Sequence, residues 1–291
     1  MIDLKIPPPI FDERAYLLAN PDVAEAVRKG ALSSGWQHVL LSGYQEPRVG
    51  LPSSLKAEVS NYWRTVQAEM PPPELRERVH GSPDHLGFHL IGRQIADDID
   101  AALTRHAVGA PEKPSTLDFG CGCGRVTWHV KRQHPAWTIT GCDIDAEAIA
   151  WCQQHLQRVA TFDLIEHWPP VALASDTFDL IYAISVFTHL GEEMQFAWLK
   201  ELQRLAKPGG LLLLSVHSIA LLGDARASEA RKEGFVYSAA RAAEGLPDFY
   251  RTSWHSSGYI RDNWSQYFDI VEIVEKGINN HQDLVVACRR R

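Results

Sequence analysis

Cysteine is scarce in this sequence and is scattered along it. Of 291 residues, five are cysteine: Cys121, Cys123, Cys142, Cys152 and Cys288. So few thiols at scattered positions exclude a disulfide framework and favour a reducing compartment. Cys121 and Cys123 match half of a metal-ligand pattern, but no second cysteine or histidine pair follows at ligand spacing, so we expect no metal site.

Clusters of positive charge and long apolar runs are also missing. The 29 lysines and arginines are outnumbered by 36 acidic residues, which gives a net charge of −7, and they form no basic block. A partner with a phosphate backbone is therefore disfavoured, and we expect no nucleic acid to bind. No stretch approaches the ~20 apolar residues of a membrane-spanning helix, and no basic segment followed by an apolar run begins the chain. We therefore expect a cytoplasmic protein with no membrane partner.

Two proline runs divide the chain into three predicted parts. Pro7–Pro9 and Pro71–Pro73 favour extended structure over helix, which suits joints between packed pieces. Residues 1–50 are predicted to form a small helical module. Residues 51–114 are predicted to form a helical linker and cap, and residues 115–291 the main domain.

From residue 115 onward, short apolar runs alternate with amphipathic stretches. The predicted strands are 116–119, 137–142, 159–162, 178–185, 211–217, 268–275 and 284–288. The predicted helices are 12–30, 74–106, 125–133, 145–158 and 192–207. Such alternation in the main domain is typical of βαβ units and of a mostly parallel sheet in an α/β fold. The turn over 276–283 is too short for a helical crossover, so the last two strands are expected to form an antiparallel hairpin.

The first strand of the main domain runs into a glycine-rich loop, Gly120-Cys121-Gly122-Cys123-Gly124, which precedes a helix. Glycines at this point let backbone amides approach a ligand closely. A dinucleotide site requires G-x-G-x-x-G, whereas here Arg125 stands where the third glycine would fall, which points away from a pyrophosphate ligand. Asp143, about 20 residues beyond the loop at the end of the second strand, is placed to accept hydrogen bonds from ribose hydroxyls.

Four segments in this order resemble the class I S-adenosylmethionine-dependent methyltransferases. They are Leu117–Gly124, Gly141–Ile144, Phe178–Ile181 and Leu205–Leu211, and the resemblance covers residues 115–289. It implies a Rossmann-like α/β fold: a seven-stranded, mostly parallel sheet with an antiparallel C-terminal hairpin, plus N-terminal helical segments. It also implies methyl transfer as the activity, with S-adenosylmethionine as the cofactor lying across the ends of the first, second and fourth strands.

The same resemblance implies a set of cofactor contacts. The residues assigned to the cofactor are Arg93, Asp118, Gly120, Cys121, Gly122, Asp143, Ile144, Asp163 and Ser185. Gly120 and Gly122 allow close backbone approach. Asp118 orients the loop or the methionine amino group, and Ser185 passes beside the sulfonium.

Two of these assignments have alternatives. The adenine contact comes from Asp163 or from Glu166, after the third strand. Arg93 meets the methionine carboxylate in a charge-assisted pair, or it is a solvated arginine on a surface helix.

Three histidines lie where a general base could act, which methyl transfer needs only if the acceptor arrives protonated. They are His189 after the fourth strand, His217 at the end of the fifth, and His255. An imidazole titrates near neutral pH, which suits proton removal. Of the three, we predict His189 and His255 as the candidates for the catalytic base. The alternative for each is a hydrogen-bonded imidazole that orients a loop.

The acceptor is the least determined part of the prediction. Residues 16–23, with His38 and Gly43 further on, are similar to a short module of bacterial surface-polysaccharide enzymes, which favours a small-molecule or glycan acceptor methylated at oxygen or nitrogen. The aromatic-rich segment 237–267 is expected to form the acceptor pocket, or to belong to the core. Two other functions stay open: a module that binds S-adenosylmethionine without turnover, and a nucleotide-dependent oxidoreductase, against which the missing third glycine and the hairpin argue.

Overall fold

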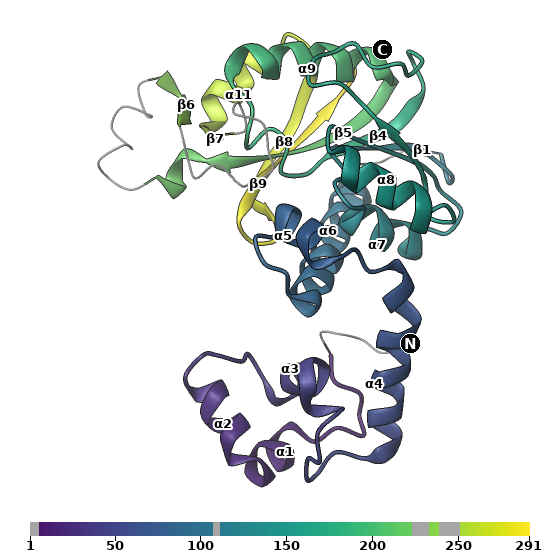
Figure 1. Ribbon diagram of the computed structural model, residues 1–291. Coiled ribbons are helices and arrows are strands. Elements are labelled where there is room, and N and C mark those ends of the chain that lie inside the picture. The colour runs from purple at the N-terminus through teal and green to yellow at the C-terminus, as the bar shows by residue number, and fades with distance from the viewer. Residues whose placement is uncertain (1–5, 107–110, 223–232, 239–250) are drawn as a thin grey trace. The chain divides into compact units, whose positions relative to one another are not determined.

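The structure is a computed structural model, and it describes residues 6–106, 111–222, 233–238 and 251–291. The chain forms two compact units (Figure 1). The N-terminal unit comprises Met1–Pro72 and Asp84–Leu90, and the sheet unit comprises Pro73–Pro83 and Ile91–Arg291. The predicted three-part division, with boundaries after residues 50 and 114, stays a prediction.

The N-terminal unit is helical. Its elements are α1 (Glu13–Ala19), α2 (Pro21–Arg28), α3 (Gly35–His38), the π-helical turn η1 (Val39–Gly43), α4 (Ser53–Val66) and the 3-10 turn η2 (Gln67–Glu69). Asp12 caps α1 by accepting a 2.9 Å hydrogen bond from the Ala15 amide, and Asn20 separates α1 from α2. Tyr16 is fully buried and its hydroxyl lies 2.9 Å from His38 Nδ1, which ties α1 to α3.

The sheet unit is built on one mixed sheet. Its body contains β1 (Ser115–Phe119), β2 (Thr138–Asp143), β3 (Thr161–Leu164), β4 (Phe178–Ala183), β5 (Ala206–Ser218), β8 (Asp269–Ile278) and β9 (Gln282–Cys288). The strands β3-β2-β1-β4-β5 are parallel neighbours in that order. β9 is antiparallel to β5, and β8 is antiparallel to β9. The predicted α/β fold, mostly parallel with an antiparallel C-terminal hairpin, is confirmed.

Two further strands extend the sheet beyond the seven of this body, and the sequence reading did not predict them. β7 (Thr252–His255) pairs in parallel with the end of β5, and β6 (Phe235–Ser238) pairs antiparallel with β7. Both strands belong to the aromatic-rich segment 237–267 or border it. Residues 239–250 of that segment lie outside the described residues.

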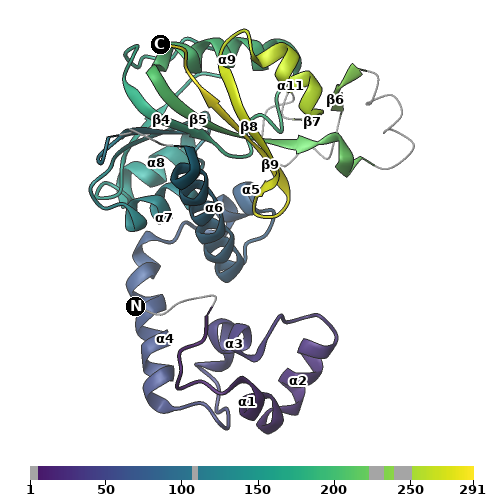
Figure 2. The same cartoon turned by 180° about the vertical axis from the view of Figure 1, so that it is seen from behind.

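Helices cover both faces of the sheet (Figures 1 and 2). They are α5 (Pro73–His80), α6 (His85–His106), α7 (Arg125–Gln133), α8 (Ala146–His155), α9 (Glu192–Leu205) and α11 (Ser257–Trp264), with a short 3-10 turn η3 (Ile219–Leu221). Because side chains alternate along a strand, neighbouring residues of β4 enter different cores. Ile181 is buried in the cluster that contains Leu199 of α9 and Trp264 of α11. Leu180 is buried in the opposite cluster, with Ile99 of α6.

The helix predicted over residues 74–106 is a correction, because the structure divides it into α5 and α6. Gly81, with φ +73°, and Pro83 lie between the two helices. A left-handed glycine ends one helix, and the residue before a proline is disfavoured in the helical conformation. The break lets α5 reach the sheet edge separately from α6. None of the described helices is both long and apolar enough to cross a membrane.

Candidate active site

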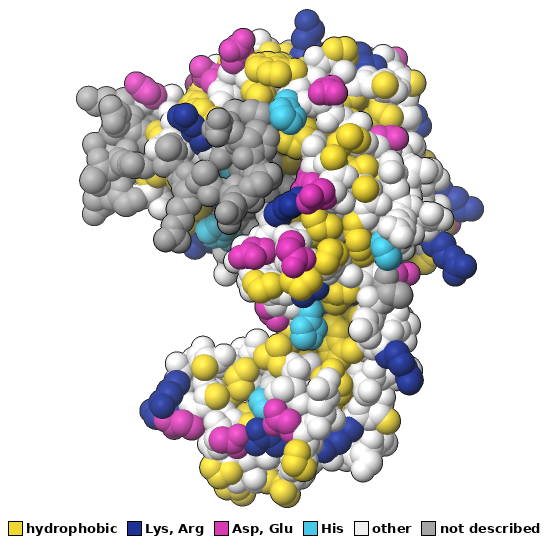
Figure 3. Space-filling view, in the orientation of Figure 1, with side chains coloured by type: hydrophobic (Ala, Val, Ile, Leu, Met, Phe, Trp, Pro, Cys, Tyr) yellow, Lys and Arg dark blue, Asp and Glu magenta, His cyan; other side chains and the backbone are white. Residues whose placement is uncertain are grey.

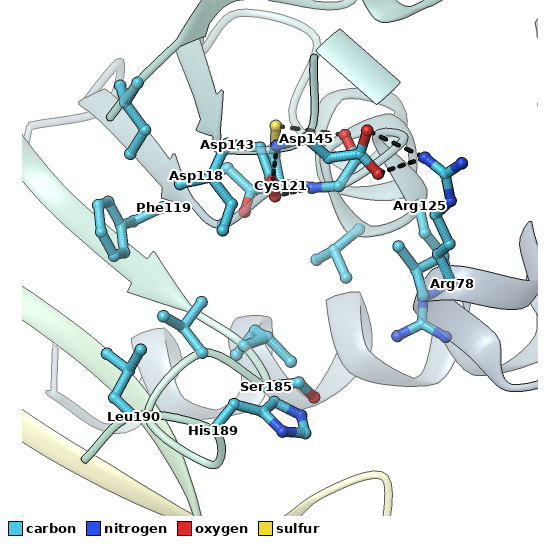
Figure 4. Close-up of a pocket in the computed structure, with 18 of the residues that line it drawn as sticks. Arg78, Asp118, Phe119, Cys121, Arg125, Asp143, Asp145, Ser185, His189 and Leu190 are labelled. Carbon is cyan, nitrogen blue, oxygen red and sulfur yellow. Dashed lines mark hydrogen bonds and ion pairs between the residues drawn. The ribbon is translucent and has the colours of Figure 1, made fainter. Parts of the chain in front are cut away.

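A cavity of about 270 Å³ lies at the carboxyl ends of β1, β2 and β4 (Figure 4). Ligands of open α/β sheets bind at this edge. Eight of the residues predicted to act on the cofactor or acceptor line it: Asp118, Gly120, Cys121, Gly122, Asp143, Ile144, Ser185 and His189. The sheet topology therefore brings together residues that are spread over 72 positions of the sequence, from 118 to 189 counted inclusively.

At Gly120 and Gly122 the glycine loop has no room for a side chain. Gly120 has φ +76° and Gly122 has φ +52°, a backbone region that favours glycine. A Cβ atom on Gly120 would lie 2.2 Å from a methyl carbon of Val186, and one on Gly122 would lie 2.5 Å from a methyl carbon of Val79. The Gly120 amide donates to the Cys142 carbonyl at 2.8 Å, which fixes the loop to β2. Glycine is therefore required at both positions by the backbone conformation and by the valine side chain that packs against each.

Asp143 joins the glycine loop to the end of β2. Its Oδ2 accepts a 2.7 Å hydrogen bond from the Gly122 amide, and its Oδ1 accepts one of 2.9 Å from the Asp145 amide. Burial raises the pKa of the Asp143 carboxyl, although these amide bonds oppose that shift. Each carboxylate oxygen has a second lone pair, so the group can also accept bonds from two ribose hydroxyls.

Asp118 is buried beneath the loop and lines the cavity. Its Oδ2 accepts a 2.6 Å hydrogen bond from the Thr127 hydroxyl. Burial raises the pKa of this carboxyl to about 7, with a smaller contribution from Asp143 in the same direction. A cationic ligand group beside Asp118 would favour the ionised carboxylate.

Two arginines lie on one side of the cavity (Figure 4). Arg78 of α5 is bonded to Asp145 at 2.9 Å and to Glu147 at 2.5 Å, which holds α5 against the start of α8. Arg125 begins α7, and burial lowers the pKa of its guanidinium. Within the described part of the chain, Arg125 Nε is buried without a hydrogen-bond partner. A partly exposed guanidinium with a buried, unused donor is suited to bind an anionic ligand group.

Arg93 was predicted to contact the methionine carboxylate, and Arg125 was considered only as a departure from the dinucleotide pattern. The structure corrects that assignment. Arg93 lies further along α6, where its Nε donates to Asp97 at 3.2 Å, and it does not line the cavity. Arg125 follows the loop directly, so its place in the motif was the signal that could have identified it.

Asp163 is likewise corrected. It is exposed on β3 and does not line the cavity, and Glu166 is also exposed and absent from the wall. Ile165 and His167 supply this part of the wall. The predicted third strand, 159–162, begins two residues before β3, so Asp163 was expected after the strand, whereas it lies within it.

His189 lies on the side of the cavity opposite Asp143 (Figure 4). Its Nδ1 is 2.7 Å from the carbonyl oxygen of Arg251, and burial lowers the pKa of the imidazole. The ring centroid of His217 is 6.3 Å from that of His189 and 5.7 Å from that of His281. Burial, and then these two neighbours, lower the pKa of His217 to about 4.

His255, the second predicted base, occupies a closed aromatic environment and not the cavity wall. It is 1% exposed, and the rings of Phe235, Tyr259 and Trp264 lie within 6 Å of its centroid. Its Nε2 lies 2.9 Å from Gln195 Oε1, and burial lowers the pKa of the imidazole to about 3. An imidazole enclosed in this way cannot reach a substrate, so the prediction of His255 as a base is corrected to a structural role.

Comparison with known proteins identifies the domain. Residues 117–212 match a family described as a methyltransferase domain. A malonyl-[acyl-carrier protein] O-methyltransferase of Magnetococcus marinus is 28% identical over 60% of this chain and 63% of its own length. A tRNA N(3)-methylcytidine methyltransferase of Schizosaccharomyces pombe is 33% identical over 36% of this chain and 46% of its own length. The chain therefore spans less than two thirds of these relatives.

A solved structure has the same fold. The magnesium protoporphyrin IX methyltransferase of Synechocystis PCC 6803, with bound SAH, matches with a TM-score of 0.52 at 20% identity, over 80% of this chain and 99% of that one.

The exclusion of nucleic acid partners is wrong. Several relatives are tRNA or rRNA methyltransferases. The exclusion relied on the net charge of −7, yet the local potential of a groove depends on the charges that line it and not on the sum.

The cavity fits the cofactor that these comparisons imply. S-adenosylmethionine carries a ribose, an ammonium and a carboxylate but no phosphate. Asp143 offers an acceptor for the ribose, Asp118 a carboxyl for the ammonium, and Arg125 an unused Nε donor for the carboxylate, and the glycine loop lies between them. Residues 117–212 are thus similar to a methyltransferase domain, and the cavity that they help to form suits S-adenosylmethionine as the cofactor.

Proposed function

We propose that this protein transfers the methyl group of S-adenosylmethionine to an oxygen or nitrogen of a small-molecule or glycan-like acceptor. This proposal is supported by the cavity that has residues of the glycine loop, Asp118, Asp143 and Arg125 in its wall and His189 opposite Asp143. The similarity of residues 16–23 to a module of polysaccharide enzymes supports the glycan-like class.

Within this proposal each wall residue has one task toward the cofactor. Asp143 accepts the ribose hydroxyls, the backbone of Gly120 and Gly122 receives the methionine tail, and Ser185 lies beside the sulfur. Asp118 holds the ammonium, and Arg125 holds the carboxylate in a charge-assisted pair. When bound, the cofactor supplies a methyl group on a positively charged sulfur, already activated for in-line displacement.

The remaining work of the protein is alignment and the exclusion of water. The apolar wall residues Phe119, Leu190, Met194 and Trp198 serve the second task. The rings of Phe119 and Trp198 pack at 4.8 Å between centroids, which closes the wall behind the cavity. Val79 of α5 lies over Gly122 and adds a cover from the other side.

Two measurements test the proposal in sequence. Calorimetry should detect binding of S-adenosylmethionine and of its demethylated product. Methyl-labelled cofactor is then incubated with the protein and a panel of hydroxylated small molecules, oligosaccharides and RNA, and incorporation is counted. No cofactor binding at hundreds of micromolar overturns the proposal. Binding without incorporation across the panel would favour a binding module, and incorporation into RNA alone would replace the acceptor class.

A further inference from the structure

The chain turns at Ser185, two residues after β4, in a backbone conformation that serine rarely adopts. Ser185 has φ +62°, in the left-handed region that favours glycine. A residue with a side chain keeps such a conformation when its surroundings hold it there. The turn places the next residue, Val186, against Gly120 of the glycine loop. Both Ser185 and Val186 line the cavity, so the conformation of Ser185 shapes the cavity wall.

Two polar side chains from neighbouring strands hold Ser185 in this conformation. The Ser185 amide donates to the hydroxyl of Ser215, on β5, at 2.7 Å, and Ser215 is fully buried. Gln282 begins β9, 97 residues further along the chain, and its Nε2 donates to Ser185 Oγ at 2.8 Å. The first contact fixes the backbone and the second fixes the side chain. Ser215 and Gln282 together therefore determine where the Ser185 hydroxyl lies.

The contact with Gln282 leaves the proton of the Ser185 hydroxyl available to a ligand. Ser185 Oγ also lies 3.3 Å from Gln282 Oε1, beyond the range of about 2.5–3.0 Å for a hydroxyl that donates to an oxygen. The bond from Nε2 is the better of the two, and in it Oγ is the acceptor. Ser185 is partly exposed and lies on the side of the cavity away from Asp118 and Asp143 (Figure 4). Its O–H can therefore donate to a ligand atom that bears a lone pair.

An acceptor oxygen suits this donor better than an acceptor nitrogen does. The oxygen of an alcohol or a carboxylate can receive the hydrogen bond on one lone pair while another attacks the methyl carbon. A neutral amine has a single lone pair, which a hydrogen bond from Ser185 would occupy. The positively charged sulfur of the cofactor repels the positive end of a donor. The ligand atom that faces the hydroxyl is therefore an oxygen of the methyl acceptor.

We propose that the Ser185 hydroxyl donates a hydrogen bond to the oxygen that is methylated, and that Gln282 and Ser215 are positioning residues for this hydroxyl. The inference rests on the proposed function and narrows its acceptor atom to oxygen. The acceptor oxygen forms a bond to the methyl carbon as the carbon–sulfur bond breaks, and the electron pair of that bond stays on sulfur. A hydroxyl acceptor loses its proton to the solvent, and a carboxylate acceptor has none to lose.

Two substitutions and their combination test the positioning role. Ser185→Gly removes the hydroxyl and suits the left-handed backbone, so the turn should persist. At saturating cofactor it should lower kcat/KM for a methylated panel compound about tenfold. Gln282→Met removes the donor at similar length and should lower it about fivefold. The double variant should lose about tenfold and not about fiftyfold, because both residues act through one contact. Additive losses would overturn the role of Gln282.

Gln203→Met is the matched control. Gln203 is also half-buried, and its Nε2 donates to the Tyr267 carbonyl at 2.5 Å, away from the cavity. Added to Ser185→Gly, it should leave kcat/KM as in the single variant. Calorimetry should give the wild-type Kd for S-adenosylhomocysteine and S-adenosylmethionine in all of these variants. A loss of cofactor affinity in Ser185→Gly would make the hydroxyl a cofactor contact and overturn the proposal.

The acceptor atom has its own readout. Both basic and acidic side chains occur on the face of the molecule in Figure 3, so the panel includes neutral sugars as well as RNA. In paired compounds that differ by a hydroxyl or an amino group at one position, incorporation of the labelled methyl should follow the hydroxyl. Incorporation into amino compounds or base nitrogens alone would overturn the oxygen acceptor and leave methyl transfer intact. No incorporation into any compound would instead remove the proposed function on which this inference rests.

Discussion

The Gly122 amide donates a 2.7 Å hydrogen bond to Oδ2 of Asp143, so the loop after β1 and the end of β2 are held as one piece. The carboxylate that is placed to bind the ribose is also the group that shapes the glycine loop. Loss of this side chain therefore removes a ligand contact and the loop geometry together.

Asp143→Asn should weaken binding of S-adenosylmethionine by roughly 10- to 100-fold, because hydrogen bonds to a charged group contribute about 1.5–3 kcal/mol. An asparagine has one acceptor oxygen, and its amide nitrogen would face the Gly122 or the Asp145 amide, donor against donor. Calorimetry measures the change. Asp163→Asn is the matched control on the neighbouring strand, and it should bind as the wild type does. An equal loss of cofactor affinity in both variants would contradict the assignment of the ribose contact to Asp143 and not to Asp163.

Gly120→Ala should lower both stability and cofactor affinity, because the new Cβ would lie 2.2 Å from Val186 in a backbone at φ +76°. Gly30→Ala separates the two causes. Gly30 has φ +75° with nothing within 4 Å of an added Cβ, so it reports the conformational cost alone, about 1–2 kcal/mol. Denaturant unfolding should show a larger loss for Gly120→Ala, and calorimetry a loss of binding in that variant only. Wild-type binding by Gly120→Ala would refute the close-approach role of the loop.

The parts of the fold with local signals were predictable from the sequence. Apolar runs identified β1, β2, β4 and β5, and the short final turn identified the hairpin. Glycines at the end of β1 identified one wall of the cavity, because glycine is favoured where the backbone has a positive φ. The ribbon of β6 and β7 lacks such a signal, since its strands are four residues long and depend on pairing with the end of β5.

Contacts between distant residues were not predictable. Arg93 lies in α6 and Arg125 begins α7. Only the packing of these two helices decides which guanidinium lines the cavity. His255 resembles a base in the sequence, yet its partner Gln195 is 60 residues away and its aromatic neighbours come from two further elements. Burial of an imidazole is a property of that packing and not of its neighbours in the chain.

Arg125→Gln should weaken binding of S-adenosylhomocysteine at least tenfold and leave adenosine binding unchanged. The guanidinium is proposed to hold the carboxylate of the amino-acid tail, which adenosine lacks, and a charge-assisted pair of this kind is among the strong hydrogen bonds. Arg93→Gln is the matched control, since Arg93 bonds to Asp97 on the helix surface. Parallel losses for both ligands would place Arg125 under the adenosine and not at the tail.

Asp118→Asn should stabilise the cofactor-free protein at pH 8 while weakening its binding of cofactor. The pKa of the Asp118 carboxyl is raised from 3.8 to about 7, so the folded state retains a proton that the unfolded state has lost. The stabilisation by this group is fully present below pH 4 and is lost as the pH rises through 7. The total loss in the free energy of unfolding is on the order of 4 kcal/mol.

The Asn variant escapes that loss, so the two proteins should have Tm values that diverge between pH 5 and pH 8. The ammonium of the cofactor favours the carboxylate, so wild-type binding near pH 6.5 should release a proton. Calorimetry in buffers of different ionisation enthalpy detects this release, and its absence would show that Asp118 is ionised before binding.

His255→Gln should retain cofactor binding and methyl transfer and should flatten the acid side of the stability profile. The pKa of His255 falls from 6.5 to about 3 in the folded state, so the unfolded chain takes up a proton that the folded chain refuses. The stabilisation by His255 is fully present above pH 6.5 and is lost as the pH falls toward 3, with a loss of about 2 kcal/mol by pH 5.

Glutamine cannot titrate, and it can still donate to Gln195 Oε1, which accepts from His255 in the wild-type protein. Urea unfolding at pH 7 and pH 5 should therefore show a smaller decrease for the variant, with the remaining decrease owed in part to His217. A variant with the wild-type pH dependence but with slow methyl transfer would return His255 to the catalytic residues.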